Sequence, residues 1–559
     1  MNFIARNRRF PSFIFIITIL SLLSLLASAC QPLSLEVEQV SAAVDLMKVQ
    51  AAACDYGGLV RAVEALDNYT VRFSLCSPDP SFPAKLAHPV FAIQDSEFLD
   101  LHQGDSTAMG ANPNGSGPYR VKSYQMGSSL VLEPNPDYWG VPPRLKELVF
   151  RWSLSPVFRL ADLSLGNVDG VDRPEVNSYY SISRDPNLKL ISRPPLNVVY
   201  IGMNNRFEPF DDIRVRQGLS MMIDPQRILY NYYPIGSQVA TQFLPPAMGI
   251  GYSPGYRWLD LDTRAGLQLL EEAGFDFDQT LVMSYSNASS DLIPYPQQIV
   301  QGIISQLTSY GIKVEMKAMT PTDFAESLRY GNEAFFLNAW RADYLDANSL
   351  FETFFRPDSE MLGDLDSDIL RIVKEASSTS DPNERQLRYN LSNELIRLNV
   401  PAMPLVHVNS SMVFRKEIQG MMAGVLSENF EEIIGREGRL VFMQSREPGA
   451  LWPSDETDED TFRITRLLYS TLVQNDVDSI GLQPGLAESW ESNADQTQWT
   501  FSLRYGVKFS NGAVLDANDV VASFAAMWDI NNPNHSGKSG KYEIFRRFFG
   551  GFLNQAATQ

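Results

Sequence analysis

A short loop after an apolar run concentrates charged and aromatic side chains. The run that begins at Ala334 ends in Trp340–Asn348, which places a guanidinium, two carboxylates and a phenol close together. Side chains of these types form ion pairs and hydrogen bonds with a polar ligand. We therefore expect the loop to face a binding cleft. Its candidate ligand-binding residues are Trp340, Asp343, Tyr344 and Asp346.

The chain lacks the residue patterns that catalysis or a metal centre would need. We find no GxSxG, SxxK or paired-carboxylate motif for hydrolysis. The Gly-rich NPNGSGPY is a turn, because no Lys-Ser/Thr pair or helix start follows it. The four histidines are scattered, without HExxH or zinc-like Cys/His spacing. We predict no enzyme activity, no catalytic residues, no metal and no cofactor.

Alternating strands and helices precede the loop. Leu281–Tyr285 and Ile312–Lys317 are typical of strands, and Pro296–Ser309 and Asp323–Arg329 are typical of helices. This alternation predicts crossover connections and a parallel sheet with helices on its faces. Ligands of such sheets bind outside the carboxyl ends of the strands, where this loop would lie.

A later helix carries clear start signals. Asp381–Glu384 combines an N-cap residue, a proline at the first helical position and a capping-box acid. Leucines then recur at helical spacing, and we expect them to form the buried face. They are Leu387, Leu391, Leu395 and Leu398.

Length and charge limit the possible classes. A chain of 559 residues is too long for one core, so we expect at least two domains. The formal net charge of -20 favours solubility and argues against a nucleic-acid partner, which needs a basic face.

The first residues have the pattern of an export signal. Arginines precede an apolar stretch, Phe13–Leu26, that is too short for a comfortable membrane span. The following segment, ending at Cys30, resembles a bacterial lipobox. We predict a signal peptide at residues 1–29 and a lipidated Cys30 at the start of a partly helical tether, residues 30–57. Ordinary cleavage without lipidation is the alternative.

Two further cysteines, Cys54 and Cys76, lie after the predicted signal. In an exported protein they can form a disulfide. They can equally remain two unpaired small apolar residues, because sequence does not show whether their Cα atoms approach.

Two extended segments divide the remaining chain. Near Pro195–Tyr200 and Val400–Val408 the chain crosses into and out of a region of α/β character. A domain inserted into another through two extended strands has the topology of a hinge. We predict an inserted lobe II at residues 198–404, with lobe I formed by residues 58–197 and 405–434.

Motifs of recognisable sequence cover nearly the whole chain after Cys54. They include ALDNYTVRFSL, NPNGSGPYR, LEPNPDYWG, FDDIRVRQGLSMMID, AWRADYLDA and LVFMQSREPGALWP. Together they resemble the extracytoplasmic solute-binding proteins of peptide-type ABC importers, solute-binding family 5. The resemblance implies an α/β, two-lobed periplasmic-binding-protein fold of the large peptide-binding type, with the ligand between the lobes.

The order of the segments differs from that of the family. The part like Leu440–Phe552 comes first in the family and last here, and each segment occurs once. The chain therefore resembles a circular permutation, in which residues 435–559 supply the part of lobe I that is N-terminal in relatives. A monomer is expected. The alternative is a rearranged gene with two partial copies that folds by exchanging segments between chains.

The resemblance also implies roles for individual residues. Asp343 would capture the α-amine of a peptide, an interaction of up to ~4 kcal/mol at about 4 Å and an effective dielectric of 20. Its alternative is a local turn or a pair with Arg341. Trp340 would form an apolar wall or pack in the core, and Asp346 can equally be a turn residue.

Four more residues are candidates for the walls of the cleft. Tyr200 and Asn204 lie beside the first crossing, where they would contact a peptide backbone or pack in the hinge. Arg446 and Glu447 follow a strand of the opposite lobe, where family members line the cleft; solvated charges are the alternative.

The resemblance implies a lipid-anchored receptor that delivers a small peptide to the transmembrane subunits of an ABC permease. It would be held at the outer face of the cell membrane or in the periplasm. The alternatives are the same fold binding an oligosaccharide or another small solute, and a repurposed surface lipoprotein without a transport role.

Overall fold

The computed structural model of the chain describes residues 45–555. From Leu46 onward the chain forms one compact unit that contains four sheets. The predicted signal peptide, Cys30 and most of the tether lie outside the described residues. No helix within residues 45–555 combines the length and the apolar character that crossing a membrane requires.

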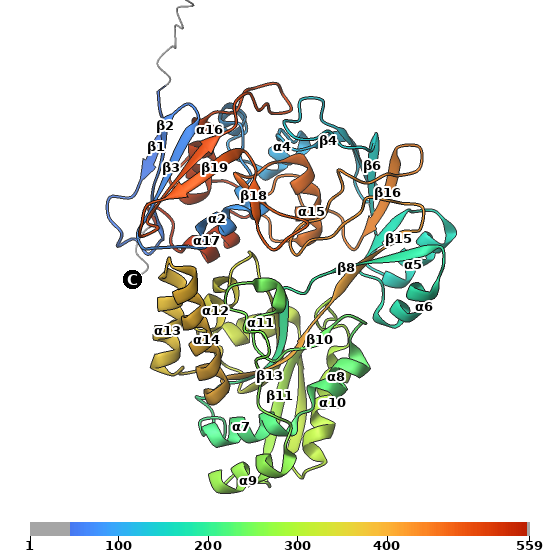
Figure 1. Cartoon of the computed structure of the whole chain (residues 1–559), viewed down its shortest axis with the longest axis vertical. Coiled ribbons are helices and arrows are strands. Elements are labelled where there is room, and N and C mark those ends of the chain that lie inside the picture. Colours follow the sequence, from blue (N-terminus) through green and yellow to red (C-terminus); the bar gives the residue numbers. More distant parts are fainter. Residues whose placement is uncertain (1–44, 556–559) are drawn as a thin grey trace, which may run out of the picture. The chain divides into compact units, whose positions relative to one another are not determined.

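The first three strands of the described chain form one five-stranded sheet with two strands from residues 487–503. Its order is β1 (Lys48–Gln50), β2 (Val60–Asp67), β3 (Thr70–Leu75), β20 (Gln498–Leu503) and β19 (Ala487–Ser492). Strand β20 pairs antiparallel with β3, so the blue and red parts of the chain lie side by side in Figure 1. Of the predicted tether, Lys48–Gln50 form β1, which pairs antiparallel with β2.

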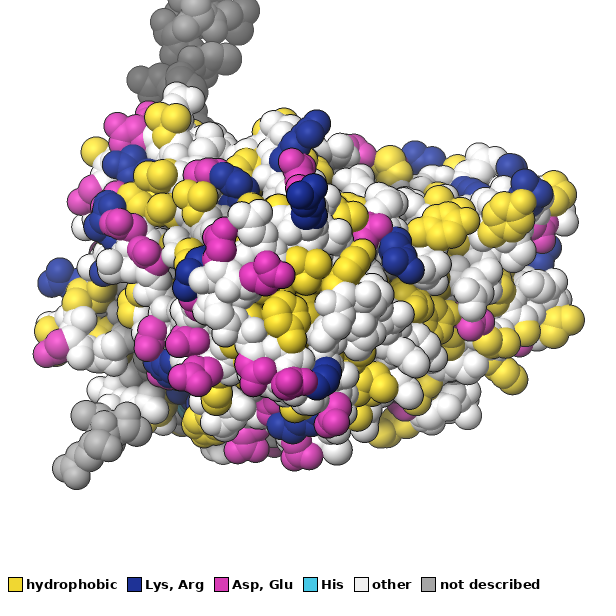
Figure 2. Space-filling model, turned by 90° about the horizontal axis from the view of Figure 1, so that it is seen from below, with side chains coloured by type: hydrophobic (Ala, Val, Ile, Leu, Met, Phe, Trp, Pro, Cys, Tyr) yellow, Lys and Arg dark blue, Asp and Glu magenta, His cyan; other side chains and the backbone are white. Residues whose placement is uncertain are grey.

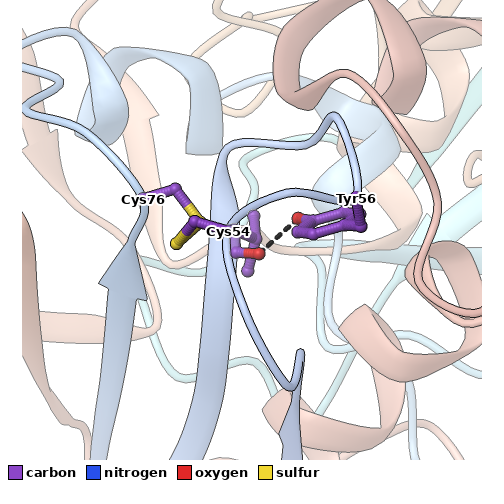
Figure 3. Close-up of a disulfide and its surroundings, with 4 residues drawn as sticks. Cys54, Tyr56 and Cys76 are labelled. Carbon is purple, nitrogen blue, oxygen red and sulfur yellow. Dashed lines mark hydrogen bonds between the residues drawn. A yellow bond between two sulfur atoms is a disulfide. The ribbon is translucent and has the colours of Figure 1, made fainter.

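A disulfide joins the segment after β1 to the end of β3. Cys54 and Cys76 are bonded, with their Cα atoms 5.5 Å apart. Beside the disulfide, the Tyr56 hydroxyl donates to the carbonyl oxygen of Val60 (Figure 3). The disulfide therefore holds the segment after β1 against the end of β3. The sequence left open whether these two cysteines pair, and in the structure they do.

A seven-stranded sheet also combines distant parts of the chain. Its order is β4 (Tyr119–Gln125), β5 (Ser129–Pro134), β6 (Glu147–Trp152), β16 (Arg439–Gln444), β7 (Gly170–Asp172), β15 (Ser410–Arg415) and β8 (Leu188–Arg193). Strand β16 is parallel to both of its neighbours, β6 and β7. It reads LVFMQ over Leu440–Gln444, all buried, as expected for a central strand covered on both faces. A two-stranded ribbon, β17 (Val473–Asn475) and β18 (Leu482–Pro484), completes the strands of lobe I.

We call the part of the chain that carries these sheets lobe I. Its helices are α2 (Phe82–Leu86), α3 (Ser96–His102), α4 (Ser106–Ala111), α5 (Pro156–Leu165), α6 (Tyr179–Arg184), α15 (Glu459–Leu468), α16 (Ala517–Trp528) and α17 (Glu543–Phe549). Every side chain of α16 is buried except Asn518, and the helix packs on β2. The C-terminal segment is thus part of the core of lobe I.

Lobe II is built on a six-stranded sheet. Its order is β10 (Gln238–Val239), β14 (Ala402–His407), β9 (Asn197–Met203), β13 (Phe335–Arg341), β11 (Thr280–Ser286) and β12 (Lys313–Met319). The predicted parallel pairing is confirmed for β11 with β12 and β13. The sheet is nevertheless mixed, because β9 runs antiparallel to β13 and β14.

Helices cover this sheet. They are α7 (Ile213–Met222), α8 (Pro225–Tyr232), α9 (Thr263–Ala273), α10 (Pro296–Thr308), α11 (Pro321–Arg329), α12 (Asn348–Phe354), α13 (Ser367–Ser378) and α14 (Pro382–Asn399). Acidic, basic and hydrophobic side chains are interspersed over the face shown in Figure 2.

Helix α14 begins as predicted but buries a different face. The Asp381 carboxylate accepts from the backbone N–H groups of Asn383 and Glu384 at 3.0 and 2.8 Å. The prediction that the leucines form the buried face is wrong. Leu387 is 67% exposed, and Leu391 and Leu398 are also exposed. The buried face is instead largely polar: Arg385, Tyr389, Ser392, Asn393 and Ile396.

Two short crossings connect the lobes. Residues 194–196 separate β8 from β9, and residues 408–409 separate β14 from β15. Asn197 joins them: its Nδ2 donates to the Val408 carbonyl oxygen at 2.9 Å, and its Oδ1 accepts from the Val408 N–H at 2.7 Å. The predicted boundary between residues 404 and 405 falls inside β14, which continues to pair with β9 as far as Val406.

The buried His407 makes the hinge sensitive to acid. Burial lowers its pKa to about 4, although its ring Nδ1 lies 2.6 Å from the Asn197 carbonyl oxygen. Between pH ~6.5 and ~4 the unfolded chain therefore binds the proton more readily, and stability should fall by up to roughly 3 kcal/mol as the pH drops. Urea unfolding at pH 7 and 4.5 measures this. His407→Asn should reduce the pH dependence; an unchanged dependence in the variant would contradict the assignment.

Candidate functional site

An ion pair between the lobes marks the candidate site. Strand β13 ends at Arg341, and the loop before α12 carries Asp343. The Asp343 carboxylate accepts from Nη1 of Arg547 at 2.8 and 3.0 Å. Arg547 lies on α17 of lobe I, so this pair spans the two lobes. Asp343 does not pair with Arg341, which instead pairs with Asp291.

Aromatic rings surround this pair. The Arg547 guanidinium lies over the Trp340 ring, 5.5 Å from its centroid. Trp340 also packs edge-on against Phe354 at 6.3 Å. Its Nε1 is buried and has no hydrogen-bond partner within residues 45–555. The half-buried Trp340 thus forms an apolar wall beside Asp343 and supports the guanidinium through its π face.

Because the carboxylate of Asp343 is mostly buried, its ionised form needs a cation beside it. The side chain is 19% exposed. Burial raises the pKa of its carboxyl group, while the Arg547 guanidinium opposes this shift and Glu459 adds to it. A partly desolvated carboxylate of this kind is stabilised by any cation that reaches it.

A cavity of about 220 Å³ adjoins the pair. Glu352 lines it from α12, and burial raises the pKa of its carboxyl group despite the Lys85 ammonium nearby. Lys85 is itself buried and donates to Asp79 at 2.8 Å. The walls of the cavity carry guanidinium groups as well as these carboxylates. They are completed by Tyr344, Asn348, Ser349, Thr353, Arg356 and Phe548.

The other predicted residues of the loop anchor it. Both oxygens of Asp346 accept from the Arg385 guanidinium, at 2.6 and 2.7 Å, so this carboxylate is already paired within lobe II. Tyr344 is only 4% exposed and packs edge-on against Phe548 of lobe I at 4.9 Å. In this structure, Asp346 fixes the loop and Tyr344 connects the lobes.

Tyr200 and Asn204 lie in the core of lobe II. Tyr200 is fully buried, and its hydroxyl accepts from Asn338 at 3.1 Å. Asn204 is also fully buried and donates to the Gly331 carbonyl oxygen at 3.1 Å. Of the two expectations for these residues, ligand contact or packing, the structure shows packing: Tyr200 points from β9, and Asn204 from the residue after it, into the interior of lobe II.

Arg446 and Glu447 belong to a loop of lobe I. The Glu447 carboxylate accepts from the Tyr124 hydroxyl at 3.0 Å and from the Gly127 N–H at 2.7 Å. It therefore holds the turn between β4 and β5. Arg446 is exposed, and its backbone N–H donates to Asp460 at 2.9 Å. The structure gives neither side chain a contact with the Asp343 pair.

A buried charge cluster lies on the lobe I side of the crossings. Asp172, at the end of β7, is fully buried and pairs with Arg193 and Arg463, each at 2.8 Å. Glu428 pairs with the same two guanidinium groups. Burial alone would raise the pKa of Glu428, but the two arginines hold it at about 2. Both acids are therefore ionised at neutral pH, and their charges are compensated.

A second cavity, of about 340 Å³, opens beside this cluster. Arg463 and Arg466 of α15 line it together with Asn475 of β17 and Glu431 of the segment before β16. Burial raises the pKa of Glu431 to about 7. A small neighbouring cavity shares Arg463 and Arg466 and reaches Arg341 of lobe II. The small cavity therefore lies between the lobes, whereas the described residues that line the larger one belong to lobe I.

The arginines that lobe I contributes to these sites were not predicted from the sequence. Arg547 lies in EIFRRFF, a stretch that reads as an apolar helix with two solvated arginines. Arg463 and Arg466 lie in an equally ordinary helix. Spacing by three could have indicated that both project from one face of α15. It could not have indicated which segment that face meets.

Two lobes joined by two short crossings, with charged cavities between and beside them, form an architecture that can close about a hinge. The chain matches the family model for bacterial extracellular solute-binding proteins, family 5, over residues 35–361 and 481–546. These ranges cover well over half of the chain, and the chain belongs to this family. The family consists of extracytoplasmic binding proteins, which confirms the prediction that the chain is not an enzyme.

Curated relatives agree with this family. The chain is 24% identical to the dipeptide-binding protein of Escherichia coli (strain K12) over 386 residues, which are 68% of this chain and 72% of the relative. It is 25% identical to di/tripeptide-binding protein 1 of Pseudomonas aeruginosa over 367 residues, 64% of this chain and 68% of the relative. Heme-binding protein A of Haemophilus influenzae is also 25% identical, over 64% of this chain and 66% of the relative.

Solved structures confirm the fold. HbpA2 from Haemophilus parasuis has a TM-score of 0.62 at 24% identity, covering 68% of this chain and 76% of that chain. A dipeptide-binding protein from Pseudoalteromonas sp. SM9913 in complex with Met-Leu has a TM-score of 0.57 at 21% identity, with the same coverage. The predicted two-lobed α/β fold is thereby confirmed.

Removing one acid from the buried cluster should destabilise the fold strongly. Asp172→Asn leaves Arg193 and Arg463 with an uncompensated charge, and the expected loss is about 3–5 kcal/mol in the free energy of unfolding. The control Asp368→Asn removes an exposed pair with Arg371 and should cost less than about 1 kcal/mol. Urea unfolding of both variants provides the comparison, and equal losses would contradict a structural role for the cluster.

Proposed function

We propose that the protein captures a small peptide between its lobes, with Asp343 binding the peptide's α-amine. The observation that carries this proposal is the Asp343 carboxylate, which is mostly buried and satisfied only by a cation from the opposite lobe. The names of the relatives, which include dipeptide- and di/tripeptide-binding proteins, support a peptide ligand. Trp340 offers an apolar wall for a side chain next to the amine.

In this proposal Arg547 is a substitute for the ligand. Its guanidinium occupies the position beside Asp343 that an ammonium would take, and it joins the lobes. A peptide amine must therefore displace it. Displacement exchanges one ion pair for another, so the net gain in affinity is smaller than that of an ammonium meeting a free carboxylate.

Paired substitutions test this exchange. Asp343→Asn removes the charge and should weaken dipeptide binding by about tenfold to a hundredfold. Arg547→Met removes the competitor and should strengthen binding by about threefold to tenfold. The control Arg546→Met changes the adjacent guanidinium, which lies over Phe552, and should leave affinity unchanged.

Isothermal titration calorimetry gives the three affinities with the tightest binder from a dipeptide panel. Unchanged binding in Asp343→Asn would remove the amine-capture role. Weaker binding in Arg547→Met would show that Arg547 contacts the ligand and does not compete with it.

We also propose that the chain is a circularly permuted member of the family that folds as a monomer. Its support is the position of Phe549–Gly551: the Phe549 carbonyl oxygen accepts from the Leu59 N–H at 2.7 Å, and the Gly551 N–H donates to the Gly57 carbonyl oxygen at 2.9 Å. This segment thus lies beside the start of β2, to which it would connect in relatives. The proposal places lobe I at residues 58–197, 405–434 and 435–559 and lobe II at 198–404, adjusted to the crossings described above.

We propose further that the protein is a lipoprotein that delivers its ligand to an ABC permease. The lipobox-like sequence before Cys30 and the extracytoplasmic family support this location. Several acyl chains anchor a protein firmly, because each buried methylene contributes about 0.8 kcal/mol.

Cys30→Ser should move the protein from the membrane fraction to the soluble fraction. The loss of acylation removes the anchor without changing the folded lobes. Fractionation followed by immunoblotting measures the distribution. Retention of the variant in the membrane fraction would indicate that the N-terminal apolar segment itself is the anchor.

A further inference from the structure

A groove on lobe II lies between two neighbouring helices, α8 and α10 (Figure 1). All of its lining residues belong to these helices, and none of them lines the cavities beside Asp343 or α15. Its volume is about 370 Å³, within the range of about 300–1,000 Å³ that small-molecule sites occupy. The groove is therefore large enough for a ligand and separate from the proposed peptide site.

A glycine inside α10 lets the two helices approach closely. Gly302 lies within α10, where glycine is less favourable for a helix than alanine. A Cβ at this position would lie 2.9 Å from the Tyr232 hydroxyl oxygen, 3.0 Å from Cε2 of the same ring and 3.4 Å from Cδ1 of Ile228. Gly302 thus allows the Tyr232 ring of α8 to lie against α10, and Tyr232 and Ile228 give the groove an apolar surface.

One buried amide presents a hydrogen-bond donor to the groove. Gln306 is 5% exposed, and its Oε1 accepts from the Asp224 N–H at 2.7 Å. This bond fixes the orientation of the amide, because only its oxygen can accept from a backbone N–H. The Nε2 of Gln306 has no hydrogen-bond partner among residues 45–555, and the side chain lines the groove. It is therefore a positioned donor that a ligand can use.

Other polar side chains of the groove also lack partners in the described part of the chain. They are the amides of Asn231, Gln298 and Gln301 and the hydroxyl of Ser305. Each amide can both donate and accept hydrogen bonds. Among the described residues that line the groove, only Arg227 carries a charge. The groove therefore offers many donors and acceptors and little charge.

This combination favours a neutral sugar over a charged ligand. A divalent cation needs carboxylates, and none of the described lining residues supplies one. An anion would be attracted by Arg227 but not by the amide oxygens beside it. The hydroxyl groups of a sugar both donate and accept, as the amides do, and the C–H surface of a sugar ring packs on an aromatic ring such as that of Tyr232.

We propose that the groove between α8 and α10 binds a neutral oligosaccharide. The amides of Gln298, Gln301 and Gln306 bond its hydroxyl groups, and one sugar ring packs against Tyr232. This site is additional to the proposed peptide site, and the inference does not depend on the proposed peptide function.

Three neutral trisaccharides test the groove: maltotriose, cellotriose and tri-N-acetylchitotriose. Ligand-observed NMR titration of the mature chain carrying Cys30→Ser should give a dissociation constant of about 1 mM or tighter for at least one of them. Gln301→Ala removes one amide and should weaken this binding about threefold to tenfold. Gly302→Ala places a methyl group against Tyr232 and should weaken it about tenfold.

A matched control lies on the same helix. Gln297 is exposed on α10 but does not line the groove, so Gln297→Ala should leave sugar binding unchanged. Unchanged urea midpoints show that the variants fold, and the exposed Gln301 keeps the test valid if Gly302→Ala does not fold. The inference is overturned if the parent binds none of the three sugars, or if Gln301→Ala binds as tightly as the parent. Displacement of the sugar by inorganic phosphate would overturn it in favour of an anion site at Arg227.

A saturating dipeptide separates this groove from the site between the lobes. Sugar affinity should be the same with and without the dipeptide, because α8 and α10 alone form the groove. Loss of sugar binding on addition of the dipeptide would place the sugar between the lobes and overturn the inference. If no dipeptide binds, the proposed function fails, and the comparison of Gln301→Ala with Gln297→Ala still decides whether the groove binds sugar.

Discussion

The buried charge cluster around Asp172 is the constraint on which the arrangement of lobe I depends. Its members come from four separate parts of the chain: strand β7, the end of β8, the segment that returns from lobe II, and α15. A carboxylate in a protein interior is tolerated only when its partners are correctly placed. The cluster therefore requires all four segments to meet, and it fixes β8 immediately before the first crossing to lobe II.

The charged groups at the boundary between the lobes also need partners of opposite charge, but their charges are less completely compensated. In the cluster, acids and bases compensate one another within lobe I. Between the lobes, Asp343 is compensated only by Arg547, and Arg466 is not paired at all within the described residues. Such groups stabilise a ligand of opposite charge without having to break up the core.

The sequence was informative where local pattern determines structure. The β11–α10–β12–α11–β13 unit and the N-cap at Asp381 follow from periodicity and capping, and the motifs identified the family. The leucine stripe of α14 failed because Arg385 and Tyr389 reach polar partners in the loop before α12 and in α12 itself, which turns the leucines outward. The sequence could not choose between ligand contact and packing for Tyr200, Asn204 and Glu447, and it did not indicate Arg547, because contacts between segments far apart in the chain decide where these side chains lie.

Native mass spectrometry of the mature chain carrying Cys30→Ser, mixed with a dipeptide panel, tests the central claim most directly. On the proposal that one chain supplies every part of lobe I and binds one peptide between its lobes, the expected result is a monomer that carries a single added peptide mass. A dimer formed by exchange of the segment after residue 435 would contradict the single-chain fold. A monomer that acquires no peptide mass would contradict the binding function.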